Sequence, residues 1–179
     1  MEEDAGRYRA AANETADLVA SLFEQYHSQI FAYLYRLVDN RELAHDLTQE
    51  TFLRLLQHGD RLRQVDNRRA WTYRVASNLA FNALKRQRRF AWLPWRHGDG
   101  EATGSSLTHP GPAQTVAEQE AVQQALATLS PTYRAPLLLY SHYQLSVREV
   151  AAILEISESN VKIRLHRARQ QFREAYGEA

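Results

Sequence analysis

The chain has 179 residues, a formal net charge of +1 and no cysteine, and 44% of its residues are hydrophobic. This length allows one or two small domains that can each bury a core. The absence of cysteine excludes disulfides and thiolate zinc sites, and the sequence shows neither a long apolar run nor a signal-peptide pattern. These features predict a cytoplasmic protein with no direct membrane insertion.

The N-terminal third predicts a leader followed by two helices. Residues 1–17 are polar and charged, and we expect a loose leader there. Helical periodicity begins near Leu18 and predicts one helix to about Val38. A second helix is expected from Arg41 to about His58. The apolar positions of the first helix are Leu22, Tyr26, Ile30, Tyr33 and Leu37.

The second predicted helix carries an acidic ridge. Glu42, Asp46 and Glu50 are spaced by four residues and therefore share one face, with Gln49 beside them. The residues alone favour a solvated helix face. A carboxylate pair for acid–base catalysis is poorly supported, because nothing indicates burial or a substrate pocket.

A basic segment follows. Residues 59–69 predict a polar loop, and a third helix is expected from about Ala70 to Arg89. Its cations alternate with aromatic residues, a pattern suited to holding unstacked bases beside a phosphate backbone. The alternative, that Trp71 and Phe81 pack inward, is equally favoured by the sequence. The residues expected on the polar side are Arg74, Asn78, Lys85 and Arg88.

Residues 90–115 are rich in glycine, proline and serine and predict a flexible linker that separates two domains. The linker holds Trp92 and Trp95, for which the sequence suggests no role. A helix is expected from Val116 to Leu129. Ser130 and Pro131 then predict the start of another helix, with serine as the cap and proline in the first turn.

The segment from Leu145 to Phe172 predicts a helix-turn-helix. Ser146 and Glu149 form a capping box, and Ser157 is a natural cap for the second helix. That helix has one apolar stripe and an opposite face rich in cations and hydrogen-bond donors, which suits the major groove of DNA. A solvated basic face is the simpler alternative. The apolar stripe is Val161, Leu165, Ala168 and Phe172.

Motifs for other chemistry are not evident in the sequence. No two histidines stand at i and i+4, and no cluster of carboxylates has the spacing of a metal site. We therefore predict no metal and no cofactor. No glycine-rich phosphate loop and no nucleophile elbow occurs. An enzyme is therefore not supported.

Three motifs in order give the chain a family resemblance. They are Asp46–Phe52 (DLTQETF), Trp71–Asn78 (WTYRVASN) and Val161–Arg169 (VKIRLHRAR). With the linker between them, they resemble bacterial RNA polymerase sigma factors of the extracytoplasmic-function class, over roughly Leu18 to Arg173. The resemblance implies an all-α fold of two small helical domains joined by a flexible linker. The expected segments are a leader (1–17), a region 2-like domain (18–90), the linker (91–115) and a region 4-like helix-turn-helix domain (116–179).

The resemblance also implies a role for each surface. It implies a transcription initiation factor that binds core RNA polymerase, selects promoter DNA and assists its melting, without being an enzyme. The clamp helices of the largest polymerase subunit would bind Asp46, Gln49, Glu50 and Phe52. The melted downstream promoter element would bind Arg61, Arg63, Asn67, Arg74, Asn78, Lys85 and Arg88. The upstream element, as a duplex, would bind Ser159, Asn160, Lys162, Ile163, Arg164, His166 and Arg167. The resemblance also implies an anti-sigma factor as the regulatory partner.

The sequence departs from the family pattern on the base-reading face. Lys162 and Ile163 stand where many relatives resemble arginine followed by a small hydroxyl residue, and His166 replaces a frequent aromatic residue. The promoter sequence therefore does not follow from the resemblance. Two other functions compete: a stand-alone helix-turn-helix regulator, which leaves the acidic ridge without a task, and a sigma-mimicking adaptor that binds an anti-sigma protein and no DNA.

Overall fold

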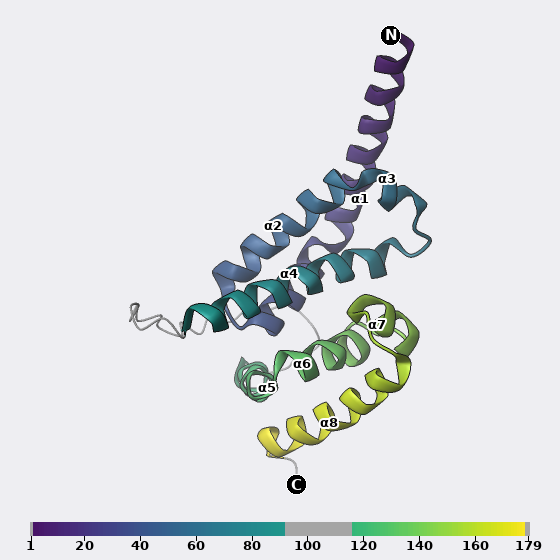
Figure 1. Ribbon diagram of the computed structural model, residues 1–179. Coiled ribbons are helices and arrows are strands. Elements are labelled where there is room, and N and C mark those ends of the chain that lie inside the picture. Colours follow the sequence, from purple (N-terminus) through teal and green to yellow (C-terminus); the bar gives the residue numbers. More distant parts are fainter. Residues whose placement is uncertain (1, 92–115, 178–179) are drawn as a thin grey trace.

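The computed structural model describes residues 2–91 and 116–177, which form helices and short connections (Figure 1). The first part contains α1 (Glu2–Val38), α2 (Arg41–Gln57), α3 (Gly59–Gln64) and α4 (Arg68–Ala91). The second part contains α5 (Val116–Thr128), α6 (Pro131–Leu137), the π-helical turn η1 (Leu138–His142), α7 (Val147–Leu154) and α8 (Glu158–Tyr176). The all-α prediction is confirmed. Trp92, Trp95 and most of the predicted linker lie outside the described residues.

Helix α1 begins at Glu2, whereas the sequence predicted a loose leader up to residue 17. Its N-terminal turns extend beyond the other helices in Figure 1. The stretch is rich in alanine, glutamate and arginine and contains no proline, so helix propensity favours continuation of the helix. Thr15 is 6% exposed because Gly59 approaches it closely. A Cβ atom at Gly59 would lie 2.1 Å from Cγ2 of Thr15, which explains the glycine.

The segment predicted as a loop at 59–69 contains the short helix α3. Leu62 anchors α3, because its side chain is fully buried in the core. Asn67 then begins α4, and its Oδ1 accepts from the backbone amide of Ala70 at 2.9 Å. The predicted polar connection is thus reduced to the residues between Gln64 and Arg68.

Helices α1, α2 and α4 pack around a shared apolar core. Ile30, Leu34, Leu37 and Leu55 are fully buried in it. The hydroxyl of Tyr33 in α1 lies 2.8 Å from that of Ser77 in α4, so a buried polar pair is satisfied within the core.

The C-terminal helices form a second bundle with an irregular turn. Ser130 has extended backbone and Pro131 follows at the first helical position, as predicted, although the Ser130 side chain makes no capping hydrogen bond. Pro136 lies inside α6 and lacks an amide donor, and the helix continues as the π-helical η1. Its last turn closes with the amide of Tyr143 donating to the carbonyl of Leu138 at 3.0 Å. Tyr143 thereby reaches the first bundle.

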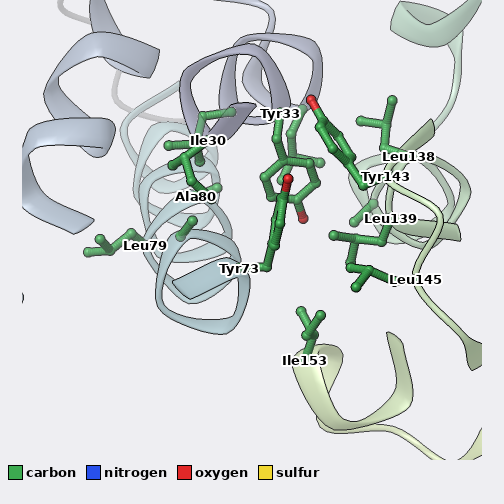
Figure 2. Packing of buried hydrophobic residues seen from close by; sticks show 14 of the residues in the cluster. Ile30, Tyr33, Tyr73, Leu79, Ala80, Leu138, Leu139, Tyr143, Leu145 and Ile153 are labelled. Atoms are coloured by element: carbon green, nitrogen blue, oxygen red, sulfur yellow. The ribbon is translucent and has the colours of Figure 1, made fainter. Parts of the chain in front are cut away.

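The two bundles pack against each other through a cluster of tyrosine rings. Figure 2 shows Tyr33 and Tyr73 from the first bundle meeting Tyr143 from the second. The ring centroid of Tyr143 lies 5.7 Å from that of Tyr33 and 5.2 Å from that of Tyr73. Burial raises the pKa of Tyr143 to about 12. Leu139, Leu145 and Ile153 surround the rings, so the apolar core is continuous between the bundles (Figure 2).

Arg134 forms a second link between the bundles. Its side chain is buried at 6% exposure, and burial lowers its pKa. Nη1 donates to the carbonyls of Arg36 at 3.3 Å and Leu37 at 3.1 Å, at the end of α1. Nη2 donates to the carbonyls of Ala127 at 2.7 Å and Leu129 at 2.9 Å, at the end of α5. A cation at two helix C-termini is favoured by both helix dipoles.

Candidate polymerase and nucleic-acid interfaces

The acidic ridge lies exposed on α2. Asn40 caps this helix by accepting from the amide of Leu43 at 2.8 Å, and the buried side places Leu47 and Thr51 in the core. Asp46 and Gln49 are exposed, as predicted, and Glu50 is about half exposed. Glu50 forms an ion pair with Arg54 at 2.8 Å, one turn further on.

Phe52 does not lie on that ridge. Its side chain is 6% exposed, and its ring centroid lies 4.9 Å from that of Phe23 in α1. The residue therefore supports the ridge from below. A partner protein that docks on the ridge would not meet its ring directly.

Two leucines that we did not predict as site residues extend the ridge. Leu53 is 53% exposed and Leu56 is 45% exposed, and two exposed leucines side by side form an apolar patch of the kind found at interaction sites. Leu53 follows Gln49 by four residues, and Leu56 follows Leu53 by three, so all three lie on one side of α2. The same helical spacing, continued beyond Gln49, predicts both leucines on this side of α2. We define the docking face as Asp46, Gln49, Glu50, Leu53 and Leu56.

The predicted cationic surface forms around Trp71 near the start of α4. The guanidinium carbons of Arg61 and Arg74 each lie 5.4 Å from the Trp71 ring centroid, within cation–π range. The ring is half-buried between these cations. The Trp71 side chain thus packs against the core and also supports the two cations.

The rest of the predicted surface follows one side of α4. Asn78, Lys85 and Arg88 are exposed and follow Arg74 at intervals of four, seven and three residues, which places them on one side of the helix. We define the α4 stripe as Arg61, Asn67, Arg74, Asn78, Lys85 and Arg88. Arg63 does not join it, since its guanidinium contacts Asp60 and Thr15 instead.

The N-terminal half of the α4 stripe is in contact with α7. Arg74 forms an ion pair with Glu155, and the Nδ2 atom of Asn67 donates to Glu149 at 2.8 Å. Arg69 donates to the carbonyl of Tyr143. These contacts join residues from the two predicted DNA-binding domains, and sequence reasoning did not foresee them.

The helix-turn-helix forms as the sequence predicted. The Ser146 hydroxyl accepts from the amide of Glu149 at 3.2 Å, and the Glu149 carboxylate accepts from the amide of Ser146 at 2.8 Å. These hydrogen bonds lower the pKa of Glu149. Ser157 accepts from the amide of Asn160 at 3.2 Å and caps α8. Glu155 lies between the helices with a φ of 56°, in the left-handed region.

The predicted base-reading side of α8 faces outward. Val161, Leu165 and Ala168 are buried on the opposite side. Asn160 and Arg164 are half-buried and bonded to each other at 3.0 Å, so they are less available than their neighbours. The exposed members of the predicted set are Ser159, Lys162, Ile163, His166 and Arg167. We define these five residues as the reading face.

A shallow groove beside the reading face contains two further cations. Lys162, His166, Arg169 and Arg173 line it together with Tyr140. The guanidinium carbon of Arg169 lies 5.3 Å from the Tyr140 ring centroid. Neither Arg169 nor Arg173 is among the residues that the sequence analysis assigned to the upstream element.

Other kinds of site are not found in the described segments. Within residues 2–91 and 116–177, no group of three or more His, Asp or Glu side chains is placed to hold a metal ion. Among the helices of those same segments, none is long and apolar enough to cross a lipid bilayer.

Comparison with known families and proteins identifies two matching segments of the chain. Residues 22–90 match the model of Sigma-70 region 2, and residues 119–172 match that of Sigma-70 region 4. The ECF RNA polymerase sigma factor SigL of Mycobacterium tuberculosis is 30% identical, with 90% of each chain covered. RNA polymerase sigma factor YlaC of Bacillus subtilis is 29% identical, covering 88% of this chain and 91% of that protein.

A solved structure also shares the fold. It is the sigma factor RpoE in complex with the anti-sigma factor NepR from Bartonella quintana. The TM-score is 0.74 at 21% sequence identity, with 89% of this chain and 96% of that chain covered.

Proposed function

This chain belongs to the extracytoplasmic-function class of RNA polymerase sigma factors, and we propose how its surfaces divide the work of promoter recognition. A sigma factor of this class is a transcription initiation factor, not an enzyme, and it gives RNA polymerase its choice of promoter. The resemblance inferred from the three sequence motifs is therefore confirmed. The residues that carry each contact are our proposal, as is action in the cytoplasm.

The docking face on α2 is proposed to bind the clamp helices of the largest polymerase subunit. Exposed leucines within an acidic ridge are the supporting observation. Leu53 and Leu56 would supply apolar area, which dominates association, while Asp46 and Glu50 would select a basic partner surface.

The α4 stripe is proposed to hold the non-template strand of the melted downstream element. Its exposed cations would bind phosphates, and its amide-bearing side chains, with the adjacent Trp71, would contact unstacked bases. Capture of a base that has left the duplex offsets a few kcal/mol of unstacking, so melting can proceed without ATP. The spacing of Asn78, Lys85 and Arg88 along one exposed side of α4 supports this assignment.

The reading face of α8 is proposed to enter the major groove of the upstream element. The single observation that best supports the proposal is the sharp difference in solvent exposure between the two sides of α8. Val161 is fully buried, whereas Ile163, two positions later, is 54% exposed. An exposed isoleucine among cations suits contact with a thymine methyl group.

A protein partner that holds the factor inactive is also part of the proposal. The solved RpoE chain of the same fold was crystallised with an anti-sigma factor. An anti-sigma factor for this chain would have to cover the docking face, the α4 stripe or the reading face.

Run-off transcription tests the whole proposal. Purified chain and core polymerase are combined with a library of promoter fragments, and the transcripts are sequenced. The proposal expects transcripts from a subset of promoters that share two elements, and these transcripts should disappear when the chain is omitted. Transcription that is independent of the chain would contradict it.

A further inference from the structure

The contact between α4 and α7 places carboxylates on cations that are proposed to bind DNA. Glu155 pairs with Arg74, and Glu149 accepts from Asn67 at 2.8 Å. Asn67 and Arg74 are seven residues apart at the start of α4, and their partners Glu149 and Glu155 are six residues apart on and just after α7. Helix α7 therefore lies along the first turns of α4. A carboxylate oxygen and a phosphate oxygen compete for the same donors. Arg74 and Asn67, two of the residues proposed to contact DNA, are therefore already bound to carboxylates.

The backbone has an unfavourable positive φ at two residues that make polar contacts between the bundles. Among the described residues, the non-glycine residues with positive φ are Asp39, Gln144 and Glu155. Such a conformation favours glycine or asparagine at the end of a helix. Asp39 accepts from Gln123 of α5 at 2.9 Å, and Glu155 pairs with Arg74. Two of the three residues in this costly conformation thus make polar contacts between the bundles.

The docking face remains accessible while these contacts are made. Helix α4 packs against both α2 and α7, and Figure 1 shows it between them. Asp46 and Gln49 are exposed in this same arrangement, and Leu53 is 53% exposed. The closed chain thus presents its polymerase surface and covers part of its DNA surface.

We propose that α7 is an autoinhibitory element, in which Glu149 and Glu155 take the place of DNA phosphates on the α4 stripe. The proposal rests on the assignment of the α4 stripe to single-stranded DNA made above. In the closed chain the N-terminal half of the stripe is masked, so the apparent affinity for a single strand falls in proportion to the fraction of molecules that are open. Polymerase docks first on the exposed α2 surface, and α4 becomes available only when the bundles separate.

The test removes the two carboxylates while preserving their hydrogen-bonding ability. The variant is Glu149→Gln with Glu155→Gln, because glutamine can still close the capping box and still accept from Asn67. The matched control is Glu158→Gln with Glu174→Gln, which changes the net charge equally at exposed positions of α8. Binding of a fluorescent single-stranded oligonucleotide to each full-length chain is measured at low salt. Small-angle X-ray scattering reports the radius of gyration.

The expected result is about three- to tenfold tighter binding by the Glu149→Gln, Glu155→Gln chain than by the control, as two exposed polar contacts allow. Its radius of gyration should rise, and adding Lys85→Ala should remove the gain, since Lys85 lies on the stripe beyond the α7 contacts. If wild type, variant and control bind equally and Lys85→Ala weakens all three, the stripe binds DNA but α7 does not mask it. That result overturns the inference alone. If no chain binds and Lys85→Ala has no effect, the assignment of the stripe fails and the inference fails with it.

Discussion

Arg134 in α6 donates to the carbonyl oxygen of Leu37 in α1 across 3.1 Å, and this bond joins the two bundles inside the protein. The guanidinium also binds the end of α5, so one cation joins the C-termini of two helices. No carboxylate pairs with it among the described hydrogen bonds and ion pairs. Its charge is stabilised by backbone dipoles at helix C-termini and by the charge of Asp39.

Replacing this arginine should destabilise the protein strongly. Arg134→Ala leaves four backbone carbonyls without their donor, and buried unsatisfied acceptors are costly. We expect a loss of about 2–4 kcal/mol in the free energy of unfolding, measured by urea denaturation. Arg86→Ala, at an exposed position of α4, is the control and should change stability by less than about 0.5 kcal/mol. Equal stabilities of the two variants would show that Arg134 does not join the bundles in solution.

The docking face predicts a polymerase-binding defect without unfolding. In the Asp46→Lys, Glu50→Lys chain we expect weaker binding to core polymerase, because the introduced lysines would repel the basic partner surface that the acidic ridge attracts. Leu53→Ala with Leu56→Ala should also weaken binding, through lost apolar contact. Glu120→Lys with Glu174→Lys makes the same charge change on the other bundle. Fluorescence anisotropy with labelled chain measures each affinity, and normal affinity in well-folded docking variants would contradict the proposal.

The helices whose pattern repeats along the chain were predictable from the sequence. Val161, Leu165 and Ala168 recur at helical spacing and are all buried, and both serine caps of the helix-turn-helix form as expected. Such signals are local, because every partner lies within a few turns. The exposed side of α8 followed directly from them.

The missed features depend on contacts that are distant in the sequence. Helix α3 depends on one anchor, Leu62, which a periodic pattern cannot reveal. The start of α1 depends on helix propensity, whereas the polarity of residues 1–17 predicts a loose leader. Arg74 and Glu155 are 81 residues apart, and Arg134 and Leu37 are 97 apart. Nothing within a helical period signals such pairs, so the packing of the bundles could not be predicted.

The α4 stripe predicts a defect in promoter opening. Asn78→Ala with Lys85→Ala should allow normal binding to duplex promoter DNA in complex with core polymerase but open it poorly, because both exposed side chains would contact only the separated strand. Permanganate footprinting of unpaired thymines measures the opening. Gln87→Ala, also exposed on α4, should open normally. Wild-type thymine reactivity in the double variant would show that these residues do not hold the melted strand.

The capping box of α7 predicts a pH dependence of stability. Hydrogen bonds from Ser146 lower the pKa of Glu149, so the folded state favours the ionised carboxylate. This contribution is complete above the ordinary pKa of glutamate and is lost as the pH falls through the lowered value. The stability advantage of wild type over Glu149→Gln should therefore shrink on acidification. Thermal unfolding of both chains between neutral and strongly acidic pH checks the trend, and an advantage that grows with acid would contradict it.

The two sides of α8 predict opposite kinds of failure. Leu165 is 4% exposed, and Leu165→Ala should cost roughly 2–5 kcal/mol of stability, as buried leucine truncations do. Arg167 is exposed, and its Nη1 donates to the Tyr133 hydroxyl at 3.3 Å. Arg167→Ala should leave the fold nearly unchanged and weaken promoter binding. Tyr133→Phe removes only the hydroxyl and tests whether that bond orients the guanidinium.

The way in which Arg167→Ala weakens binding identifies what the side chain contacts. If the guanidinium binds a guanine with two hydrogen bonds, its loss should cost about 1–3 kcal/mol and relax the preference at one base pair. If it binds only phosphate, all sequences should weaken alike, and the salt dependence should fall by about one unit. Binding of the full-length chain with core polymerase to randomised upstream elements, at two salt concentrations, separates these cases. An Arg167→Ala chain that binds every sequence like wild type at both salt concentrations would mean that this side of α8 does not face DNA.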